Sequence, residues 1–186
     1  MTDQGQGAER LGPLARFLRN WRIARLTRAV TAAQATGEPA QVLARLLELV
    51  PLLVRQRGED HAQTQSCINA VGLAYRSLER YDEAAIWYAR AMASRDRAGD
   101  TTSADYAVVC NNIGMLRMYQ GDLSAAIEHL TTALAIREQV LGANGGHTQA
   151  TLFALLECLT RDYRFEDAAN GLAKLPGIPE IGRAHV

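Results

Sequence analysis

The sequence predicts an all-α fold in which about four antiparallel helix pairs stack side by side. Small residues recur in register 42 positions apart, and three such matches are Gly72 with Gly114, Ala84 with Ala126 and Ala91 with Ala133. The connections between neighbouring helix candidates are only about three to five residues long, which makes the joined helices lie side by side. No stretch alternates apolar and polar residues as a half-buried β-strand does.

The composition is that of a globular chain with enough apolar residues for a core. Of 186 residues, 48% are hydrophobic and 22% charged, and twenty basic side chains balance twenty acidic ones. This balance gives no whole-molecule field that would attract nucleic acid or a membrane surface, so we expect neither as a partner. The longest apolar run, 46–54, is interrupted by Glu48 and Pro51 and predicts no membrane span.

The three cysteines indicate a reducing compartment. Cys67, Cys110 and Cys158 are an odd number, and each lies inside an apolar helical stretch. Buried reduced thiols fit this pattern better than a disulfide framework does. Because the first nine residues also lack an apolar signal-peptide core, we expect a cytoplasmic protein.

The helix candidates form one repeat domain, 10–175, between a disordered N-terminal tail, 1–9, and a C-terminal tail, 176–186. Its four units are expected at 10–57, 64–99, 104–142 and 148–175. Their first helices are predicted at 12–35, 64–78, 104–119 and 148–162, and their second helices at 40–56, 82–98, 123–140 and 165–175.

Local signals support these helices and suggest how they pack. Leu14, Phe17, Leu18 and Trp21 follow the i, i+3, i+4, i+7 spacing of one helix face. Pro51 lies inside a helical pattern and is expected to kink or split it. Asp82, or Asp122 with Ser124, can cap a second helix, and Gly72 and Gly114 allow the partner helix to approach closely.

The second unit resembles the tetratricopeptide repeat. The resemblance is carried by a small residue, a tyrosine, an aromatic turn, a Glu-Ala step and a final aromatic with alanine: Gly72, Tyr75, Tyr81, Glu83, Ala84, Tyr88 and Ala91. The period of 42 is longer than that family's usual spacing. Together with ALAIREQVLG (133–142), His147 and the Asn111–Asn112 pair, it resembles the kinesin light chain type of repeat.

This resemblance covers about two-thirds of the chain and is strongest in the third unit. It implies a right-handed α-solenoid whose first helices line a concave groove that holds a peptide or a partner protein. Carried over by register, the groove residues are Asn69, Leu73, Arg76, Asn111, Met115, Met118, Tyr119, Phe153, Glu157 and Arg161.

The predicted groove residues leave alternatives open. Asn69 and Asn111 are equivalent, and their amides either clamp the backbone of an extended peptide or join helices within the scaffold. Arg76 and Arg161 either anchor an anionic ligand beside Tyr119 and Met115 or pair with nearby acids. Phe153 replaces the asparagine in the fourth unit and suggests an apolar subsite or a closed groove end.

The first helix is rich in arginine. Six arginines fall between Arg10 and Arg28, and no carboxylate occurs from Arg10 to Gly37. They recur every third residue and so spread round the helix instead of forming one stripe. This pattern favours a solvated helix end or contact with an acidic partner surface over nucleic-acid binding.

Enzyme, cofactor and metal motifs are missing from the sequence, so we expect no catalytic residue, no cofactor and no metal site. The sequence predicts a non-enzymatic scaffold or adaptor that binds a peptide or partner protein. The alternative is a regulatory domain that senses a peptide and controls an enzyme or transcription factor. A C-terminal face around Leu155, Leu159 and Leu172 is the expected docking surface for another chain or for a second copy in a homo-oligomer.

Overall fold

The computed structural model describes residues 12–173, and this part of the chain is built from α-helices without any strand. The helices are α1 (Pro13–Thr36), α2 (Pro39–Arg57), α3 (Ala62–Ser77), α4 (Tyr81–Arg97), α5 (Ala104–Gln120), α6 (Leu123–Leu141), α7 (Gly146–Arg161) and α8 (Phe165–Leu172). Their ends lie within about two residues of the predicted ones, except that α8 is described only to Leu172. The predicted tails, 1–9 and 176–186, lie outside the described residues.

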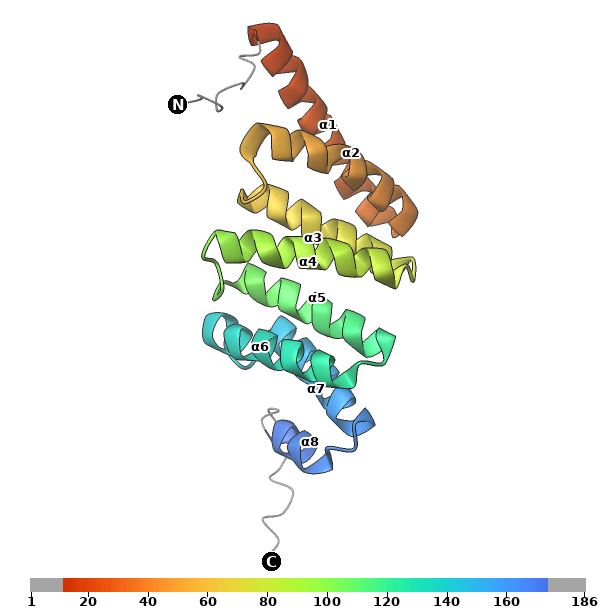
Figure 1. Ribbon diagram of the computed structural model, residues 1–186, viewed down its shortest axis with the longest axis vertical. Helices are drawn as coiled ribbons and strands as arrows, with labels where there is room; N and C mark the ends of the chain where they lie inside the picture. Colours follow the sequence, from red (N-terminus) through yellow and green to blue (C-terminus); the bar gives the residue numbers. More distant parts are fainter. Residues whose placement is uncertain (1–11, 174–186) are drawn as a thin grey trace, which may run out of the picture.

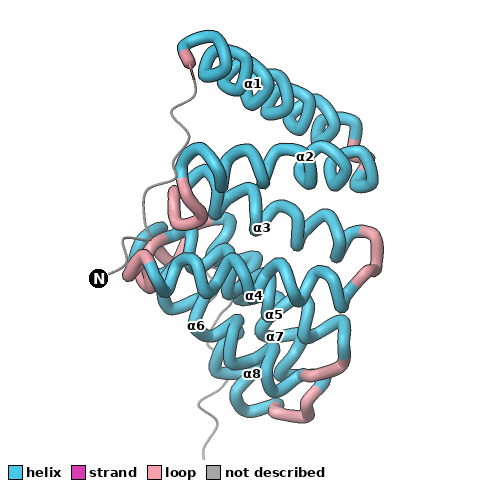
Figure 2. Tube along the Cα trace, turned by 45° about the horizontal axis from the view of Figure 1, so that its top comes forward, coloured by secondary structure: helices cyan, strands magenta, loops and turns pink. Residues whose placement is uncertain are grey.

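The helices form a single stack in chain order. Each helix packs against the next one, and α5 also contacts both α3 and α7. The stack begins with α1 at one end and finishes with α8 at the other (Figures 1 and 2). This is the all-α helical-repeat architecture that the sequence predicts.

The 42-residue period is visible in the backbone of all four pairs. The turn after each first helix contains one residue with positive φ, namely Gly37 (70°), Glu79 (58°), Gly121 (82°) and Tyr163 (58°). Neighbouring members of this series are 42 residues apart. Because residues other than glycine rarely adopt this left-handed conformation, its recurrence indicates that the first and fourth pairs follow the same repeat despite their divergent sequences.

Two glycines bring the central helix pairs into close contact, as predicted. A Cβ atom at Gly72 would lie 2.6 Å from the ring of Tyr88, and one at Gly114 would lie 2.7 Å from Cγ of Leu130. Tyr88 and Leu130 are themselves 42 residues apart and fully buried. Each glycine therefore makes room for one large side chain of the second helix.

The fourth pair makes a similar close contact with the small residue on its second helix, one position before the register of Tyr88 and Leu130. Leu156 stands where Gly72 and Gly114 stand in the other pairs, and it is buried. The space it needs comes from Gly171 on α8, where a Cβ would lie 2.7 Å from Cδ2 of Leu156. The small residue has moved to the second helix, which explains why the sequence of this unit looks degenerate.

Some local predictions need correction. Asp122 caps α6 by accepting a hydrogen bond from the Ala125 amide, but Asp82 lies in the first turn of α4 and caps nothing. Helix α2 is not split at Pro51 and continues to Arg57. Pro51 is exposed, so the carbonyl that loses its helical partner lies on the solvent side of the helix.

The predicted C-terminal docking face is wrong for two of its three residues. Leu155 and Leu159 are 8% and 5% exposed and belong to a core cluster with residues of α6. Being covered within the stack, they are not available to another chain. The side chain of Leu172 lies outside the described part of the structure.

None of the helices within residues 12–173 combines the length and the hydropathy that a membrane span requires.

Candidate functional site

The main hollow in the described structure lies where α3, α5, α6 and α7 meet, and we call it the central hollow. Its volume is about 600 Å³. Helices α3, α5 and α7 are the first helices of their pairs, so the hollow lies on the face predicted to hold a partner. Its lining consists of Leu73, Arg76, Ala104, Asp105, Val108, Asn111, Asn112, Met115, Arg137, Leu141, His147, Ala150 and Ala154.

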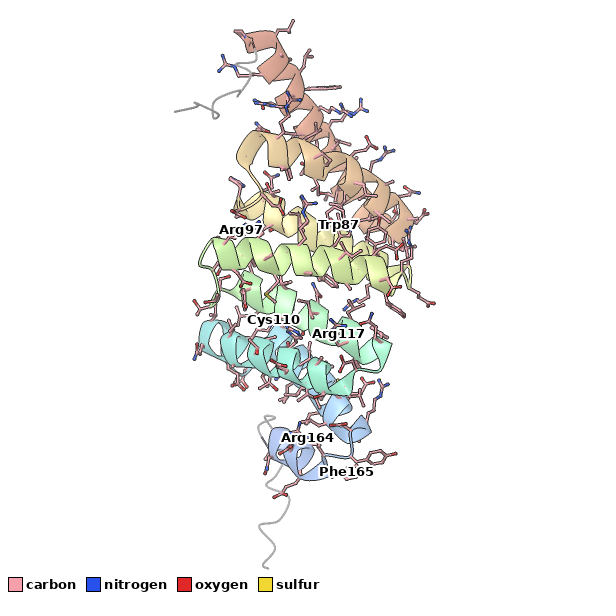
Figure 3. All side chains as sticks on the ribbon, viewed as in Figure 1. Trp87, Arg97, Cys110, Arg117, Arg164 and Phe165 are labelled. Carbon is pink, nitrogen blue, oxygen red and sulfur yellow. The ribbon has the colours of Figure 1, made fainter. Side chains whose placement is uncertain are left out.

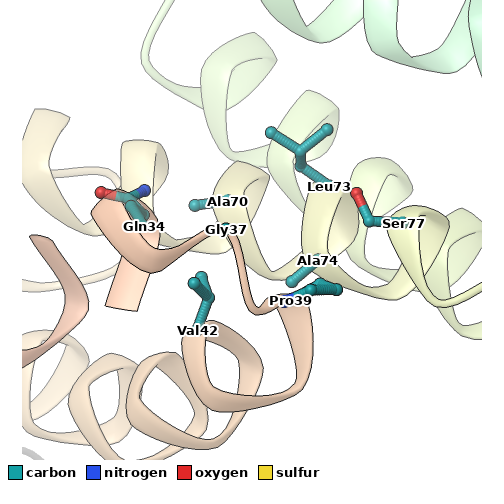
Figure 4. A pocket seen from close by; sticks show the side chains of 8 residues that line it. All are labelled: Gln34, Gly37, Pro39, Val42, Ala70, Leu73, Ala74 and Ser77. Atoms are coloured by element: carbon teal, nitrogen blue, oxygen red, sulfur yellow. The ribbon is translucent and has the colours of Figure 1, made fainter. Parts of the chain in front are cut away.

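A second hollow of about 290 Å³, here called the N-terminal hollow, continues this face toward α1. Its lining is mostly apolar and comprises Gln34, Gly37, Pro39, Val42, Ala70, Leu73, Ala74 and Ser77 (Figure 4). Leu73 lines both hollows and is 40% exposed. The two hollows therefore adjoin at this leucine.

Four of the ten predicted groove residues line the central hollow: Leu73, Arg76, Asn111 and Met115. Asn69 is half-buried on α3 and accepts a hydrogen bond from Nδ2 of Asn112 at 3.1 Å. This contact between two helices corresponds to the scaffold alternative for Asn69. Its own Nδ2 group has no hydrogen-bond partner among residues 12–173.

The other predicted residues lie elsewhere. Tyr119 is 54% exposed and stacks on Tyr81, with ring centroids 5.9 Å apart. Phe153 is 57% exposed on α7 but lines neither hollow. Met118 differs from the prediction, because it is 4% exposed and packs in the core with residues of α6 and α7.

Glu157 and Arg161 form an ion pair one helical turn apart. Arg161 Nη1 lies 3.7 Å from Glu157 Oε1, and both side chains are about half exposed. Neither lines a hollow. The structure thus shows the internal pairing that was the alternative to an anion anchor at Arg161.

Arg76 is a cation in the lining of the central hollow, and the acid in that lining, Asp105, pairs with Arg95 instead. Within the described residues it forms no ion pair, and its Nη1 atom is buried without a hydrogen-bond partner. The phenol oxygen of Tyr88 is buried and unpartnered as well. Burial raises the pKa of Tyr88 to about 12, with the Arg76 charge opposing the rise. A buried guanidinium nitrogen without an acceptor favours binding of an oxygen ligand.

Arg137 on α6 is a second cation of this hollow, and the sequence analysis missed it. It is 6% exposed, and Nη1 donates to the His147 carbonyl oxygen at 2.9 Å, to Asn111 Oδ1 at 3.3 Å and to Thr151 Oγ1. Thr151 in turn donates to Asn111 Oδ1 at 3.0 Å. All these acceptors are neutral. Desolvation by burial lowers the pKa of Arg137 because it disfavours the charged form.

The repeat register shows what Arg137 lacks. Arg95 lies 42 residues earlier, is 3% exposed, and places its guanidinium 2.7 Å from Asp100 and 3.4 Å from Asp105. One repeat later, Gly142 stands at the position of Asp100 and His147 at that of Asp105. Arg95 is therefore neutralised by two carboxylates, whereas the equivalent Arg137 pairs with neither, because the acid in the lining of the central hollow, Asp105, is paired with Arg95.

The central hollow offers hydrogen-bond donors, positive charge and apolar surface.

Among residues 12–173, no cluster of three or more histidine, cysteine, aspartate or glutamate side chains has the arrangement of a metal site. The three cysteines are free, and burial raises the pKa of Cys110 to about 11. Such a thiol is protonated near neutral pH and is a poor nucleophile. The central hollow, with Arg76 and Arg137 in its lining, is suited to recognition of an anionic group.

A family model for the tetratricopeptide repeat matches residues 64–98 and 107–147. These ranges cover the second and third helix pairs, whose Gly72 and Gly114 contacts and 42-residue turn series are described above. These two helix pairs are tetratricopeptide repeats. The first and fourth helix pairs lie outside the matched residues and share the stack and its turns.

Solved structures with the same fold include kinesin light chain-like repeats. BtubC (BKLC) from P. vanneervenii has a TM-score of 0.71 at 17% identity, covering 90% of this chain and 70% of that one. A putative kinesin light chain of nearly identical TPR-like repeats from Podosopora anserina has a TM-score of 0.73 at 14% identity, covering 82% and 72%. No curated protein matches this chain. At these identities the likeness shows the fold, and repeats of this family generally mediate contacts between proteins.

Proposed function

We propose that this protein is a non-catalytic scaffold or adaptor whose central hollow binds an extended segment of a partner protein through a carboxylate. The carboxylate, from an acidic side chain or a chain end, would lie between Arg76 and Arg137. The observation that carries the proposal is the contrast between Arg95, which pairs with two carboxylates, and Arg137, which forms hydrogen bonds only to neutral acceptors.

The energetic reason is the cost of a buried charge without a counter-charge. Such a group is tolerated when neutral acceptors surround it, but a carboxylate compensates it more fully. Arginine also binds carboxylates through two parallel hydrogen bonds, which adds geometric specificity. A ligand carboxylate in the hollow would therefore take the role that Asp100 and Asp105 have toward Arg95.

The surrounding residues suggest how the rest of the segment is held. Nδ2 of Asn111 has no hydrogen-bond partner among the described residues, so it is available to a peptide carbonyl oxygen. Leu73, Val108 and Met115 provide apolar surface for a neighbouring side chain. The N-terminal hollow beyond Leu73 is a second, apolar subsite, and the exposed Tyr119 and Phe153 are flanking contacts.

We propose a cytoplasmic location, because the three free thiols suit a reducing compartment. The hollow is too small and too apolar for a nucleic-acid backbone, which requires an extended basic surface. A regulatory role, in which the bound peptide controls an enzyme or transcription factor, uses the same hollow. It would be distinguished by a second protein whose activity changes when the peptide binds.

A displayed library of random peptides, selected on the immobilised protein, tests this proposal. We expect the selected peptides to share an aspartate, a glutamate or a free carboxyl end next to an apolar residue. The dissociation constant of the best peptide should rise at least about tenfold in Arg76→Gln and should rise with salt concentration. Arg117→Gln is the matched control, since Arg117 lines a separate hollow between α4 and α6.

Two results would overturn the proposal. One is a set of selected peptides without a common acidic group. The other is a dissociation constant that Arg76→Gln and Arg117→Gln change equally. Because Arg137 also holds Asn111 and Thr151, Arg137→Gln is informative for binding only if circular dichroism shows that the variant is folded.

A further inference from the structure

Helix α1 is longer than the other first helices of the stack. It has 24 residues, whereas α3 and α7 have 16 each and α5 has 17. In the 42-residue register, the first residue of α3, Ala62, corresponds to position 20. The first two turns of α1, 13–19, therefore have no counterpart in the later pairs, and the side view of the stack shows the start of α1 projecting beyond α2 (Figure 1).

This extension and the residues directly after it carry large apolar side chains in solvent. Leu14, Phe17, Leu18 and Trp21 are 70%, 64%, 53% and 50% exposed. Their i, i+3, i+4, i+7 spacing places them on one face of the helix, which we call the α1 ridge. The buried residues Ile23, Leu26 and Val30 point in nearly the opposite direction at 3.6 residues per turn. Most of the ridge thus faces away from α2, while Leu18 and Trp21 at one side of it also line a hollow of about 360 Å³ with Glu48 of α2.

The same helix holds a concentration of uncompensated positive charge. Arginines 16, 19, 22, 25 and 28 have no ion-pair partner among the described residues, and Nε of Arg19 is buried without an acceptor. By contrast, arginines 45, 80, 90, 95, 97, 161 and 164 each lie within ion-pair distance of a carboxylate. Arg25 lies over the ring of Trp21 at 5.4 Å, beside the ridge.

From the exposed apolar ridge and the unpaired arginines beside it, we propose that α1 docks this protein on an anionic lipid surface. The ridge would enter the headgroup region, and Arg22 and Arg25 at its edge would contact acidic headgroups. Leucine, phenylalanine and tryptophan on one face with arginine on the others is the composition of helices that lie in a membrane interface. Each basic residue near an anionic leaflet adds attraction.

Charge and shape favour this partner over the alternatives. A second copy of the chain would bring the same five arginines to the contact, and the central hollow is itself lined by Arg76 and Arg137. The ridge lies on α1, which is the outermost helix at one end of the stack (Figure 2), so a flat surface can approach it. The sequence analysis expected no membrane partner because the charges of the whole chain balance and no segment can span a membrane. A helix that lies on a membrane needs no spanning segment, and its own local charge decides the attraction.

Co-sedimentation with vesicles tests the proposal with the full chain. One vesicle preparation contains phosphatidylcholine alone, and the other contains about a third phosphatidylserine. We expect the protein to sediment with the second preparation only, and Trp21 emission to shift to shorter wavelength. A Trp87→Phe background isolates the Trp21 signal.

Three variants locate the contact. Phe17→Ser and the double variant Arg22→Glu/Arg25→Glu should each weaken vesicle binding at least about tenfold. Ile86→Ser is the matched control, because Ile86 is 67% exposed on α4, away from the ridge, and its loss should leave binding unchanged. Circular dichroism checks that each variant is folded.

Binding to neither vesicle overturns the proposal and would leave an acidic protein surface as the partner of the ridge. Equal binding to both preparations overturns it as well, because the arginines would then have no role. If Phe17→Ser and Ile86→Ser reduce vesicle binding equally, the contact lies outside the α1 ridge and the proposal is overturned.

Discussion

Asn112 donates a hydrogen bond from Nδ2 to Oδ1 of Asn69 over 3.1 Å and thereby joins α5 to α3. Its neighbour Asn111 accepts hydrogen bonds from Arg137 on α6 and Thr151 on α7. The two adjacent asparagines thus connect the third helix pair to the second on one side and to the fourth on the other. In a repeat stack, such contacts between units supply much of the cooperativity.

Asn112→Ala should lower the free energy of unfolding by about 1 kcal/mol, because Asn112 is buried and Asn69 would lose its partner. Urea denaturation followed by circular dichroism measures the change. A double-mutant cycle with Asn69→Ala should give a coupling energy of about 0.5–1 kcal/mol. Asn144→Ala, in an exposed turn, is the control, and additive effects of the two asparagine variants would contradict the contact.

Gly114→Ala should destabilise the protein by about 1–3 kcal/mol, since the added methyl would overlap Leu130. The methyl also lies 3.2 Å from the carbonyl oxygen of Ala126, which belongs to the backbone and cannot rotate away. The control is Gly146→Ala on α7, where no atom lies within 4 Å of the new Cβ. Thermal unfolding should show a lower midpoint for Gly114→Ala alone. Equal midpoints would mean that α5 and α6 pack less closely.

Glu79→Gly should stabilise the protein by about 0.5–1 kcal/mol, because glycine adopts a φ of 58° without the steric cost that glutamate has. Gly121→Ala at the equivalent turn should have the opposite sign, since alanine would have to adopt a φ of 82°. The thermal midpoints of both variants measure this, and a decrease for Glu79→Gly would indicate that the glutamate side chain has a stabilising contact.

The fold was largely predictable because it depends on short-range patterns. The 42-residue register, the short turns and the small residues at Gly72 and Gly114 together fix the helix pairs and their close contacts. The exchange of Leu156 and Gly171 was not predictable in this way. Close packing depends on the summed volume of the two side chains in contact. Aligning the repeats compares single positions, so it does not reveal a change of size at one position that is compensated at another.

The candidate site was predictable only in part, because register gives the helix face but not the partner of each side chain. Leu73, Arg76, Asn111 and Met115, which the register assigns to the groove, line the central hollow. Met118 is on the core side of α5, and Arg137 belongs to a second helix, which the prediction left out. The sequence could have pointed to Arg137, because it lies 42 residues after Arg95 and because His147 stands where a counterpart of Asp105 would be.

The cysteines should react slowly with thiol reagents in the folded protein. Burial raises the pKa of all three thiols, to about 11 for Cys110, so little thiolate is present near pH 8. Cys67 is half-buried and should react first, before the buried Cys110 and Cys158. Labelling with iodoacetamide in buffer and in urea measures the rates, and equal rates in both conditions would contradict the burial.

Stability should fall in acid partly through Glu59, which lies between α2 and α3. A hydrogen bond from Arg90 at 2.8 Å lowers the pKa of Glu59 below 4.5, burial opposes this, and the charges of Arg90 and Arg97 support it. A carboxylate with a lowered pKa in the folded state stabilises the fold above its unfolded value of 4.5, and this contribution disappears as the pH falls through the folded value.

Glu59→Gln should therefore lower the free energy of unfolding by about 0.5–1 kcal/mol near neutral pH. The effect is modest because the Glu59 side chain is 30% exposed, so solvent screens its ion pair with Arg90. The difference should shrink as the pH falls below 4.5 and vanish below the lowered folded pKa of Glu59, since Glu59 is then protonated in both the folded and the unfolded chain. Urea unfolding at a series of pH values measures the difference, with Glu128→Gln, an exposed glutamate on α6, as control. A difference that stays constant across the acid range would show that Glu59 acts through packing and not through its charge.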